Sequence, residues 1–450
     1  MTKVKKKDIY LKARIISEGL NIRGSSEKYF PHLEEEPEEL ELPDKLDLYN
    51  PEELLDFYYK SYIQSATNAY LGLSFKLRKS GLITPVAPNE HSRLDFDIEG
   101  DEATISEGGN VLTTGKFIKK PEWMNSKLSN GMPIEFALPA ASDQIINVVF
   151  TLSCMNYNTK RGCKYCNLFA NPVSRKISML PIETLEVWTK LQAEAVKIAT
   201  DNGWSGNIAI SGGALAPAQR GEYLGRLELV LNTLRDKVGE KVLAENLVVY
   251  NHFPPEDFSD MYKWKELSID ATSIDLEVMD PTCFAEICPG KNAYKPHEYW
   301  KKAQEYSLKV FGAPRTFGCI VLGIEPLSSF LAGSEERLSK GIIPIPLVFT
   351  PSPGSEYENR QPPSAEFIVK ASEGYAESFL KHAPKFLAPV IKKAIKERKE
   401  GGISNLRKAG DNSTSLSTVF DEVKRRIQGI KIMGIGFRVM KQMFKSQQDD

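Results

Sequence analysis

The sequence predicts an α/β protein built on a partial (β/α)6 TIM-like barrel, with an N-terminal α+β extension and a helical C-terminal tail. Two observations predict this class. From about residue 143 onward, short β-branched runs alternate with amphipathic helical segments, a pattern typical of a parallel sheet with crossover helices. Six such repeats occupy about 210 residues, which suits an incomplete barrel better than an eightfold one. We therefore divide the chain into residues 1–142, 143–360 and 361–450.

Composition is that of a globular chain with a large core. The 450 residues are 41% hydrophobic and 26% charged, and the formal net charge is −1. Without an overall basic field to gather nucleic acid or anionic lipid, we expect neither partner. The basic first twenty residues lack the apolar core of a secretory signal, and no later stretch is apolar for long enough to span a bilayer. We expect a cytoplasmic protein.

The N-terminal extension is expected to contain a linker, a helix and a small sheet. Residues 32–53 are acidic and interrupted by proline, as in a solvated linker or arm. Residues 51–80 are predicted to be helical. Residues 93–105 and 108–118 alternate apolar and polar positions around glycine turns, which predicts the strands of the sheet.

The barrel is predicted to contain six strands with helices between them, two of the helices at 181–201 and 295–310. The strands are expected at 145–152, 207–211, 247–251, 273–279, 316–324 and 342–349. The C-terminal region is predicted to be helical, and its last segment, 431–450, carries Lys on one side and Met and Phe on the other. We expect that segment to pack on the protein's own core in preference to a membrane or a partner.

A cluster of three cysteines follows the first of these strands. Cys154, Cys163 and Cys166 are spaced C-x8-C-x2-C. Three thiolates can hold three irons of a cubane and leave the fourth iron open, whereas a structural zinc site normally needs four protein ligands. The nearest histidines, His91 and His252, are far away in sequence. An iron-sulfur cluster is favoured, and structural zinc and a thiol redox pair are the alternatives.

These residues resemble the cluster loop of the radical S-adenosylmethionine (SAM) superfamily, which follows the first barrel strand and has an aromatic residue, here Tyr165, before its last cysteine. The family spacing is C-x3-C-x2-C, so this chain inserts five residues. The resemblance extends over residues 145–355. It implies a [4Fe-4S] cluster on the three cysteines, SAM bound to the open iron, and a one-electron donor such as a ferredoxin or flavodoxin. Reductive cleavage of SAM would give a 5′-deoxyadenosyl radical.

Other strand ends carry further parts of the resemblance. Gly212 and Gly213 follow the second strand and resemble the glycine motif that meets the methionyl amine of SAM, although Ala214 replaces the acidic residue often found next. Glu277, after the fourth strand, resembles the acidic residue near the SAM amine or ribose; a solvated strand-end carboxylate is the alternative. The fifth strand, ending in Glu325, resembles the stretch that lines the adenine.

The remaining cysteines divide into a pair and a single residue. Cys283 and Cys288 are spaced C-x4-C just past the fourth strand, where they either ligate an auxiliary iron-sulfur cluster or serve as structural cysteines. Cys319 shares the strand parity of Glu325 but lies about 20 Å away, toward the barrel floor. We expect it to be a buried core cysteine.

The N-terminal extension, the C-x4-C loop and the proline-rich end of the sixth strand are similar to the biotin-synthase-like branch, including one component of the two-protein lipoyl synthases. This similarity implies sulfur insertion into an octanoyl chain, with a second radical SAM subunit and a lipoyl-carrier protein as partners. The alternative within enzymes is another biotin-synthase-like reaction in cofactor biosynthesis, such as methylation or carbon-skeleton cleavage. From a different class, a zinc-stabilised interaction protein is the alternative.

Overall fold

The computed structural model describes most of the barrel and parts of the two flanking regions. Most of the predicted acidic linker and all of the Lys-rich segment at 431–450 lie outside the described residues. The described residues are 4–24, 26, 50, 53, 73–138, 141–142, 145–151, 154–166, 182–215, 217–352, 354–399 and 418–429.

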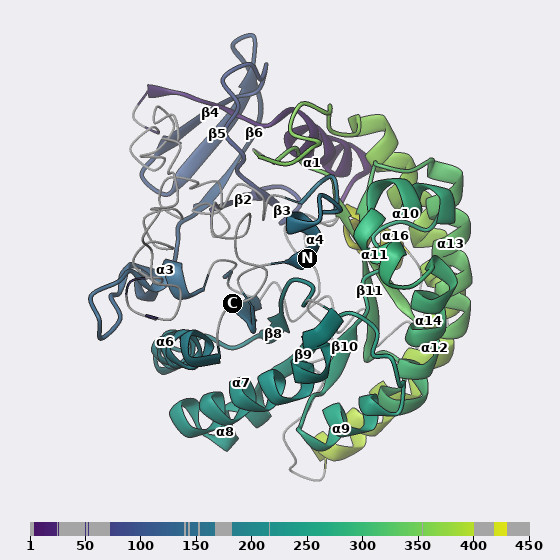
Figure 1. Cartoon of the computed structure of the whole chain (residues 1–450). Helices are drawn as coiled ribbons and strands as arrows, with labels where there is room; N and C mark the ends of the chain where they lie inside the picture. The colour runs from purple at the N-terminus through teal and green to yellow at the C-terminus, as the bar shows by residue number, and fades with distance from the viewer. Residues whose placement is uncertain are drawn as a thin grey trace.

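A six-stranded parallel sheet forms the centre of the molecule (Figure 1). Its strands lie side by side in chain order from β7 to β12, and each neighbouring pair is parallel. The strands are β7 Ile145–Val149, β8 Asn207–Ser211, β9 Leu247–Asn251, β10 Ala271–Ser273, β11 Thr316–Leu322 and β12 Ile343–Val348. This order, with helical crossovers between the strands, confirms the predicted partial barrel.

The fourth strand is shorter than predicted. We expected residues 273–279, whereas β10 ends at Ser273, and beyond it only an isolated bridge joins Glu277 to Ile320. The Asp275 carboxylate accepts a hydrogen bond from the Cys319 amide at 2.8 Å, so a side chain replaces a backbone ladder partner. Glu277 follows with a φ of 67°, in the left-handed region. The chain therefore leaves the sheet after Ser273, earlier than the alternation of apolar and polar residues predicts.

Helices cover the outer face of the sheet (Figure 1). They are α6 Ile182–Asp201, α7 Tyr223–Val238, α8 Glu240–Glu245, α9 Asp260–Glu266, α12 His297–Phe311, α13 Leu327–Lys340 and α14 Ala365–Lys399. The predicted helices at 181–201 and 295–310 correspond to α6 and α12. Each contributes a fully buried tryptophan to the core, Trp188 and Trp300. Since every strand is followed by a helix on this face, the strand ends and their loops remain on one edge of the sheet.

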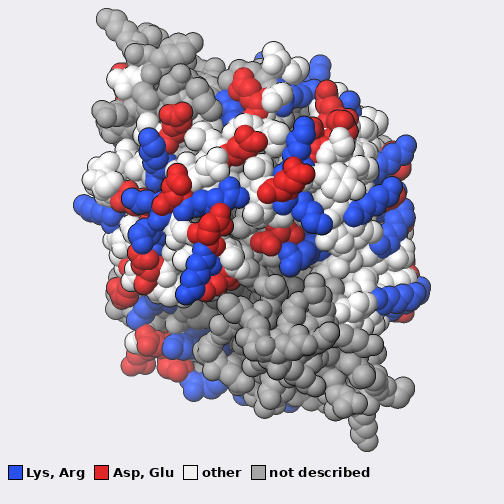
Figure 2. All heavy atoms as spheres, turned by 90° about the horizontal axis from the view of Figure 1, so that it is seen from below, with Lys and Arg blue, Asp and Glu red and all other residues white. Residues whose placement is uncertain are grey.

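The surface carries charges of both signs. In Figure 2, Lys and Arg side chains alternate with Asp and Glu over the described part of the visible face, in keeping with the net charge of −1. Among the helices that the structure describes, we found none with both the length and the apolar character of a bilayer-spanning segment.

The N-terminal region contains a second six-stranded sheet, ordered β1-β4-β5-β6-β2-β3. The two alternating segments form β4, β5 and β6, as predicted, but the predicted helix at 51–80 is wrong at its end. Residues 74–77 alternate half-buried and buried positions and pair with β3 and β6 as strand β2. The strands are β1 Asn21–Ile22, β2 Ser74–Leu77, β3 Ile83–Pro85, β4 Asp95–Glu99, β5 Glu102–Glu107 and β6 Asn110–Ile118.

The first and last described helices pack together beside the barrel. Helix α1 (Lys6–Glu18) packs on α14 and on α16 (Thr418–Gly429). A buried ion pair joins Lys12 Nζ to an Asp421 carboxylate oxygen at 2.6 Å. Helices α14 and α16 confirm the helical character predicted for the C-terminal region over the described residues.

Candidate functional site

The three clustered cysteines lie in the loop that follows β7, at the carboxyl edge of the parallel sheet. Cys154 precedes the short helix α4 (Met155–Asn158) and is buried, while Cys163 and Cys166 are partly buried in the turn that follows. The Cys166 amide donates to the Cys163 carbonyl at 3.0 Å, which closes the C-x2-C turn. This is the edge on which barrel enzymes place their active sites.

Tyr157 accounts for the eight residues between the first two cysteines. Its ring is buried against Cys154, and its hydroxyl donates to the Cys166 carbonyl at 3.0 Å. A side chain at Gly162 would overlap the ring. Burial raises the pKa of the Tyr157 hydroxyl, and the nearby sulfur groups of Cys166, Cys163 and Cys154 raise it further. The inserted residues therefore form a packed support for the cysteines. Sequence reasoning missed this role, for which the only signal was a tyrosine and a glycine within the insertion.

The glycine segment after β8 is hydrogen-bonded to the cysteine loop. The Met155 amide donates to the Ala214 carbonyl at 2.8 Å, and the Ala214 amide donates to the Cys154 sulfur at 3.3 Å. Burial raises the pKa of the Cys154 thiol, and this amide opposes the shift. A Cβ at Gly212 would lie 2.8 Å from the Phe150 and Thr151 side chains, so packing requires a glycine there. Gly213 lies next to it and is half-buried. The structure thus brings Gly212 and Gly213 to the cysteines, as predicted.

Glu277 lies in a buried polar group with Tyr165 and Lys291. Helix α11 (Pro289–Tyr294) supplies Lys291, whose ammonium pairs with the Glu277 carboxylate and donates to the Asp275 carbonyl at 3.1 Å. The Tyr165 hydroxyl hydrogen-bonds to the same carboxylate. Burial lowers the pKa of the Lys291 ammonium group, but the negative charge of the nearby Glu277 carboxylate has the larger effect. The pKa of Lys291 is therefore raised. Glu277 is therefore not a solvated strand-end carboxylate. Sequence reasoning missed Lys291.

Glu325 braces the loop after β10. Both of its carboxylate oxygens accept backbone hydrogen bonds, from the Met279 amide at 2.9 Å and from the Asp280 amide at 2.8 Å. Burial raises the pKa of Glu325 to about 7, against the opposing effect of these amides. In this arrangement the carboxylate holds the start of helix α10 (Pro281–Ile287), whose N-cap is Asp280.

The other three cysteines have separate surroundings. Cys288 is fully buried, and its thiol, together with burial, raises the pKa of the Cys163 thiol. Cys283 is only partly buried, and its thiol lies near the Asp280 and Glu325 carboxylates, which add to the effect of burial in raising its pKa. Cys319 is partly buried on the inner face of the sheet, 4.0 Å from the Ser273 hydroxyl. We predicted a buried core cysteine; burial does raise the pKa of the Cys319 thiol, but the side chain faces the barrel interior, where its neighbours Ser273 and Asp275 are polar.

The donor set of the cysteine loop fits an iron-sulfur cluster by its chemistry. Among the described residues, no three His, Cys, Asp or Glu side chains are arranged as a ready-made metal site. The three thiols nonetheless lie around one side chain, Tyr157, and Cys154 already accepts an amide hydrogen bond of the kind that stabilises a thiolate. Cys154, Cys163 and Cys166 would hold the cluster, and the neighbouring Gly212 and Gly213 would leave room for a ligand of its open iron.

The inner face of the sheet is polar toward the carboxyl ends of its strands and apolar toward their amino ends. The Ser211 hydroxyl donates to the Asn147 side chain at 2.7 Å, and Asp275 accepts from Asn251 at 2.7 Å and from Ser273 at 2.5 Å. At the amino ends of β10 to β12, the buried side chains of Ala271, Phe317 and Ile343 are covered by Phe386 of α14 and Phe420 of α16. The side chains nearest the cysteine edge are therefore the polar ones, and the apolar cluster fills the opposite end of the barrel.

Comparisons with known proteins show a relative in sequence and, among the solved structures, distant likenesses that include two structures of the maturase HydG. The chain is 40% identical over 320 residues to the bacteriochlorophyllide c C-7(1)-hydroxylase of Chlorobaculum limnaeum, covering 70% of this chain and 80% of the relative. The FeFe-hydrogenase maturase HydG of Carboxydothermus hydrogenoformans is 12% identical over 67% of this chain and 81% of that one, with a TM-score of 0.31. A second HydG structure is 11% identical over 70% and 85%, also with a TM-score of 0.31. No protein-family model matches the chain.

Proposed function

This chain belongs to the radical SAM family of the bacteriochlorophyllide c C-7(1)-hydroxylase, and from this premise we propose that it hydroxylates an unactivated carbon of a chlorophyllide-class tetrapyrrole. The observation that carries the proposal is the 40% identity to that hydroxylase, which extends over 80% of its length. It favours the alternative of a radical reaction in cofactor biosynthesis over lipoyl synthesis. Sulfur insertion, the octanoyl substrate and a second radical SAM subunit have no support from the comparisons.

In the proposed reaction, water supplies the oxygen atom of the new hydroxyl group. The [4Fe-4S] cluster, when bound, supplies one electron that cleaves SAM to methionine and a 5′-deoxyadenosyl radical. This radical would take a hydrogen atom from the substrate carbon and give 5′-deoxyadenosine. The substrate radical would pass one electron back to the oxidised cluster, and the carbon would then take hydroxide from water with release of a proton. The electron donor, such as a ferredoxin or flavodoxin, is therefore not consumed overall.

Residues of this chain would hold the reactants and exclude water. In this proposal Cys154, Cys163 and Cys166 ligate the cluster, and the backbone at Gly212 and Gly213 approaches the methionyl amine. Tyr165 and Glu277 would lie near the rest of SAM, and Glu325 would support this side of the site by holding the loop after β10. The polar side chains of the inner face, which lie toward the cysteine edge, would meet the oxygen-bearing groups of the macrocycle.

The test is an anaerobic assay with SAM, a strong reductant and bacteriochlorophyllide c. We expect 5′-deoxyadenosine and a product heavier than the substrate by one oxygen atom, and the oxygen should carry the label when the assay is run in 18O-water. Cys163→Ala is expected to abolish both products. Octanoylated lipoyl-carrier protein serves as the competing substrate. Sulfur transfer to it, without hydroxylation of the pigment, would contradict the proposal, as would zinc-loaded protein free of iron and sulfide.

A further inference from the structure

The Asp275 carboxylate lies on the inner face of the sheet, just beyond the end of β10. Thr272 turns its hydroxyl outward to Ser307 of α12, so the next residue along the strand, Ser273, faces inward. The Asp275 carboxylate accepts a hydrogen bond from the Ser273 hydroxyl at 2.5 Å and therefore lies on the same inner face. The residue is only partly buried, so its carboxylate is open to the barrel interior.

Donors from three strands hold this carboxylate in place. Besides Ser273 of β10, Asn251 at the end of β9 donates its side-chain amide at 2.7 Å, and Cys319 of β11 donates its backbone amide at 2.8 Å. A carboxylate offers about four lone-pair sites. Within the part of the chain that the structure describes, three donors reach the carboxylate. About one acceptor site therefore remains for a further donor.

No Lys or Arg side chain among the described residues forms an ion pair with the Asp275 carboxylate. The Lys291 ammonium donates to the Asp275 backbone carbonyl at 3.1 Å, but it pairs with the Glu277 carboxylate. Asp275 thus presents a fixed acceptor beside Glu277, a residue assigned above to the surroundings of SAM. It lies on the side of the inner face that is nearest the cysteine edge.

We propose that Asp275 is a catalytic residue whose carboxylate holds the water molecule that attacks the substrate carbon and takes the proton that this water releases. This inference rests on the proposed function, which supplies the substrate carbon and its hydroxylation by water. A water molecule at the open acceptor site donates one O–H to the carboxylate and keeps an oxygen lone pair free for the attack. It also lies within hydrogen-bond reach of the base, as proton transfer requires.

The proposed step is balanced in atoms and electrons. The substrate radical passes one electron to the oxidised [4Fe-4S] cluster, and the water oxygen forms the new C–O bond. One O–H bond of the water breaks, and its proton goes to the Asp275 carboxylate. The negative charge of the carboxylate also stabilises the positive charge that develops on the carbon, because the carboxylate is already held in place by its three donors.

The experiment is the anaerobic assay with bacteriochlorophyllide c deuterated at the carbon that is hydroxylated. Deuterium in 5′-deoxyadenosine reports hydrogen abstraction, and the hydroxylated pigment reports the capture of water. Asp275→Asn keeps the size of the side chain but cannot take the proton. We expect deuterated 5′-deoxyadenosine to stay within about twofold of the unmodified protein. The hydroxylated pigment formed per 5′-deoxyadenosine should fall about a hundredfold.

The exchange variant Asn251→Asp/Asp275→Asn separates chemistry from structure. In Asp275→Asn alone, the new amide turns its N–H groups toward another donor, which should lower the melting temperature of the reconstituted protein. The exchange restores a hydrogen bond from an amide to a carboxylate but moves the carboxylate to β9. We expect it to recover the melting temperature and not the hydroxylation. Asp270→Asn is the matched control: Asp270 accepts from the Val248 amide at 3.0 Å but lies just before β10, at the opposite edge of the sheet.

Three results would overturn the proposal. One is an unchanged ratio of hydroxylated pigment to 5′-deoxyadenosine in Asp275→Asn. Another is an exchange variant that recovers hydroxylation together with stability, because Asp275 would then act only through its hydrogen bonds. The third is an equal loss of deuterated 5′-deoxyadenosine and hydroxylated pigment in the exchange variant, which would place Asp275 before the attack of water. Failure of the proposed function gives a different pattern, because the unmodified protein itself would then form no hydroxylated pigment.

Discussion

The Lys291–Glu277 pair places two charges in the protein interior, at the end of the strand that the sequence predicted to be longer. The side chains are 9% and 10% exposed. The Lys291 ammonium also lies 4.7 Å from the centre of the Trp300 ring, so its charge has an aromatic face as well as a carboxylate to stabilise it. The Tyr165 hydroxyl lies close to the same Glu277 carboxylate, so this buried group borders the C-x2-C turn.

Lys291→Met is expected to destabilise the protein strongly, because it leaves the Glu277 carboxylate buried without its cation. Loss of one partner from a buried pair costs about 3–5 kcal/mol of unfolding free energy. The double variant Lys291→Met/Glu277→Gln removes both charges and should recover most of the loss. Urea unfolding of the single and double variants measures both effects. A double variant no more stable than Lys291→Met would contradict the pairing.

The site residues that could be predicted are those with a recognisable spacing in the sequence. The residues that act through contacts with distant parts of the chain were missed. The three cysteines and the glycine pair follow strands and could be located by counting. Lys291 could not be located this way, because its partner Glu277 comes from a different element and meets it only after the chain leaves β10. Tyr157 was missed because it lies among the inserted residues between Cys154 and Cys163, for which the family spacing gives no role.

At the scale of elements, helix α11 docks on the cysteine loop through a glycine. A Cβ at Gly290 would lie 2.6 Å from the Arg161 carbonyl oxygen and would overlap the Asn156 side chain. The Arg161 carbonyl cannot move without disturbing the cysteine loop. The packing of α11 on this loop therefore requires a residue without a side chain at position 290.

Gly290→Ala should therefore separate α11 from the loop and reduce cluster loading. The steric conflict is expected to cost about 1–3 kcal/mol of stability, and the iron content after anaerobic reconstitution should fall. Gly225→Ala is the control, because a Cβ at Gly225 in α7 meets nothing within 4 Å. Equal iron content in the two variants would show that the docking does not support the loop.

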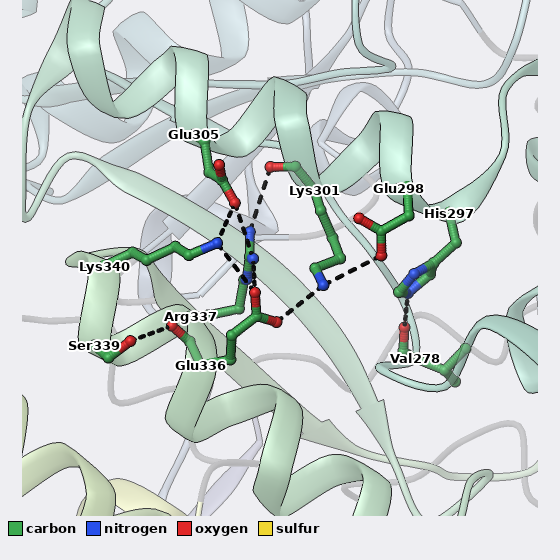
Figure 3. A network of polar contacts seen from close by, with 9 residues as sticks. All are labelled: Val278, His297, Glu298, Lys301, Glu305, Glu336, Arg337, Ser339 and Lys340. Carbon is green, nitrogen blue, oxygen red and sulfur yellow. Dashed lines mark hydrogen bonds and ion pairs between the residues drawn. The ribbon is translucent and has the colours of Figure 1, made fainter.

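Helices α12 and α13 are joined by a network of charges (Figure 3). Glu336 accepts from Lys301 at 3.0 Å, from Arg337 at 2.5 Å and from Lys340 at 3.1 Å. Partial burial raises the pKa of Glu336, but these hydrogen bonds outweigh it and lower the pKa to about 2. A carboxylate with a lowered pKa stabilises the folded protein above its unfolded pKa, and the contribution is lost as the pH falls toward the folded value.

Glu336→Gln is accordingly expected to lower the melting temperature at neutral pH and to have less effect in acid. The Glu336 side chain is 38% exposed, so solvent screening limits the loss to about 1 kcal/mol or less. The difference between variant and unmodified protein should be full above about pH 5 and shrink as the pH falls toward 3. Thermal melts across this range check the sign. A difference that grows in acid would contradict the assigned direction.

At the scale of the whole molecule, helices α1 and α16, which are far apart in sequence, form one structure beside the barrel. The division at residues 142 and 360 came from changes in sequence pattern, and such changes do not report contacts between distant segments. Lys12 on α1 and Asp421 on α16 are separated by 409 positions, yet their side chains are 2% and 12% exposed and directly paired. No local pattern could indicate this, because each residue alone looks like a polar position on an amphipathic helix.

Asp421→Ala is expected to loosen helices α1 and α16 together. It leaves the Lys12 ammonium buried without a partner, at a cost of about 3–5 kcal/mol in the stability of this contact. Hydrogen exchange followed by mass spectrometry should show faster exchange in peptides from α1 as well as from α16. Glu373→Gln is the control, since it removes the Lys6–Glu373 pair, whose side chains are 65% and 32% exposed, and exposed pairs contribute about 1 kcal/mol or less. Faster exchange in α16 alone would mean that α1 is held by its contacts with α14 and does not depend on the ion pair.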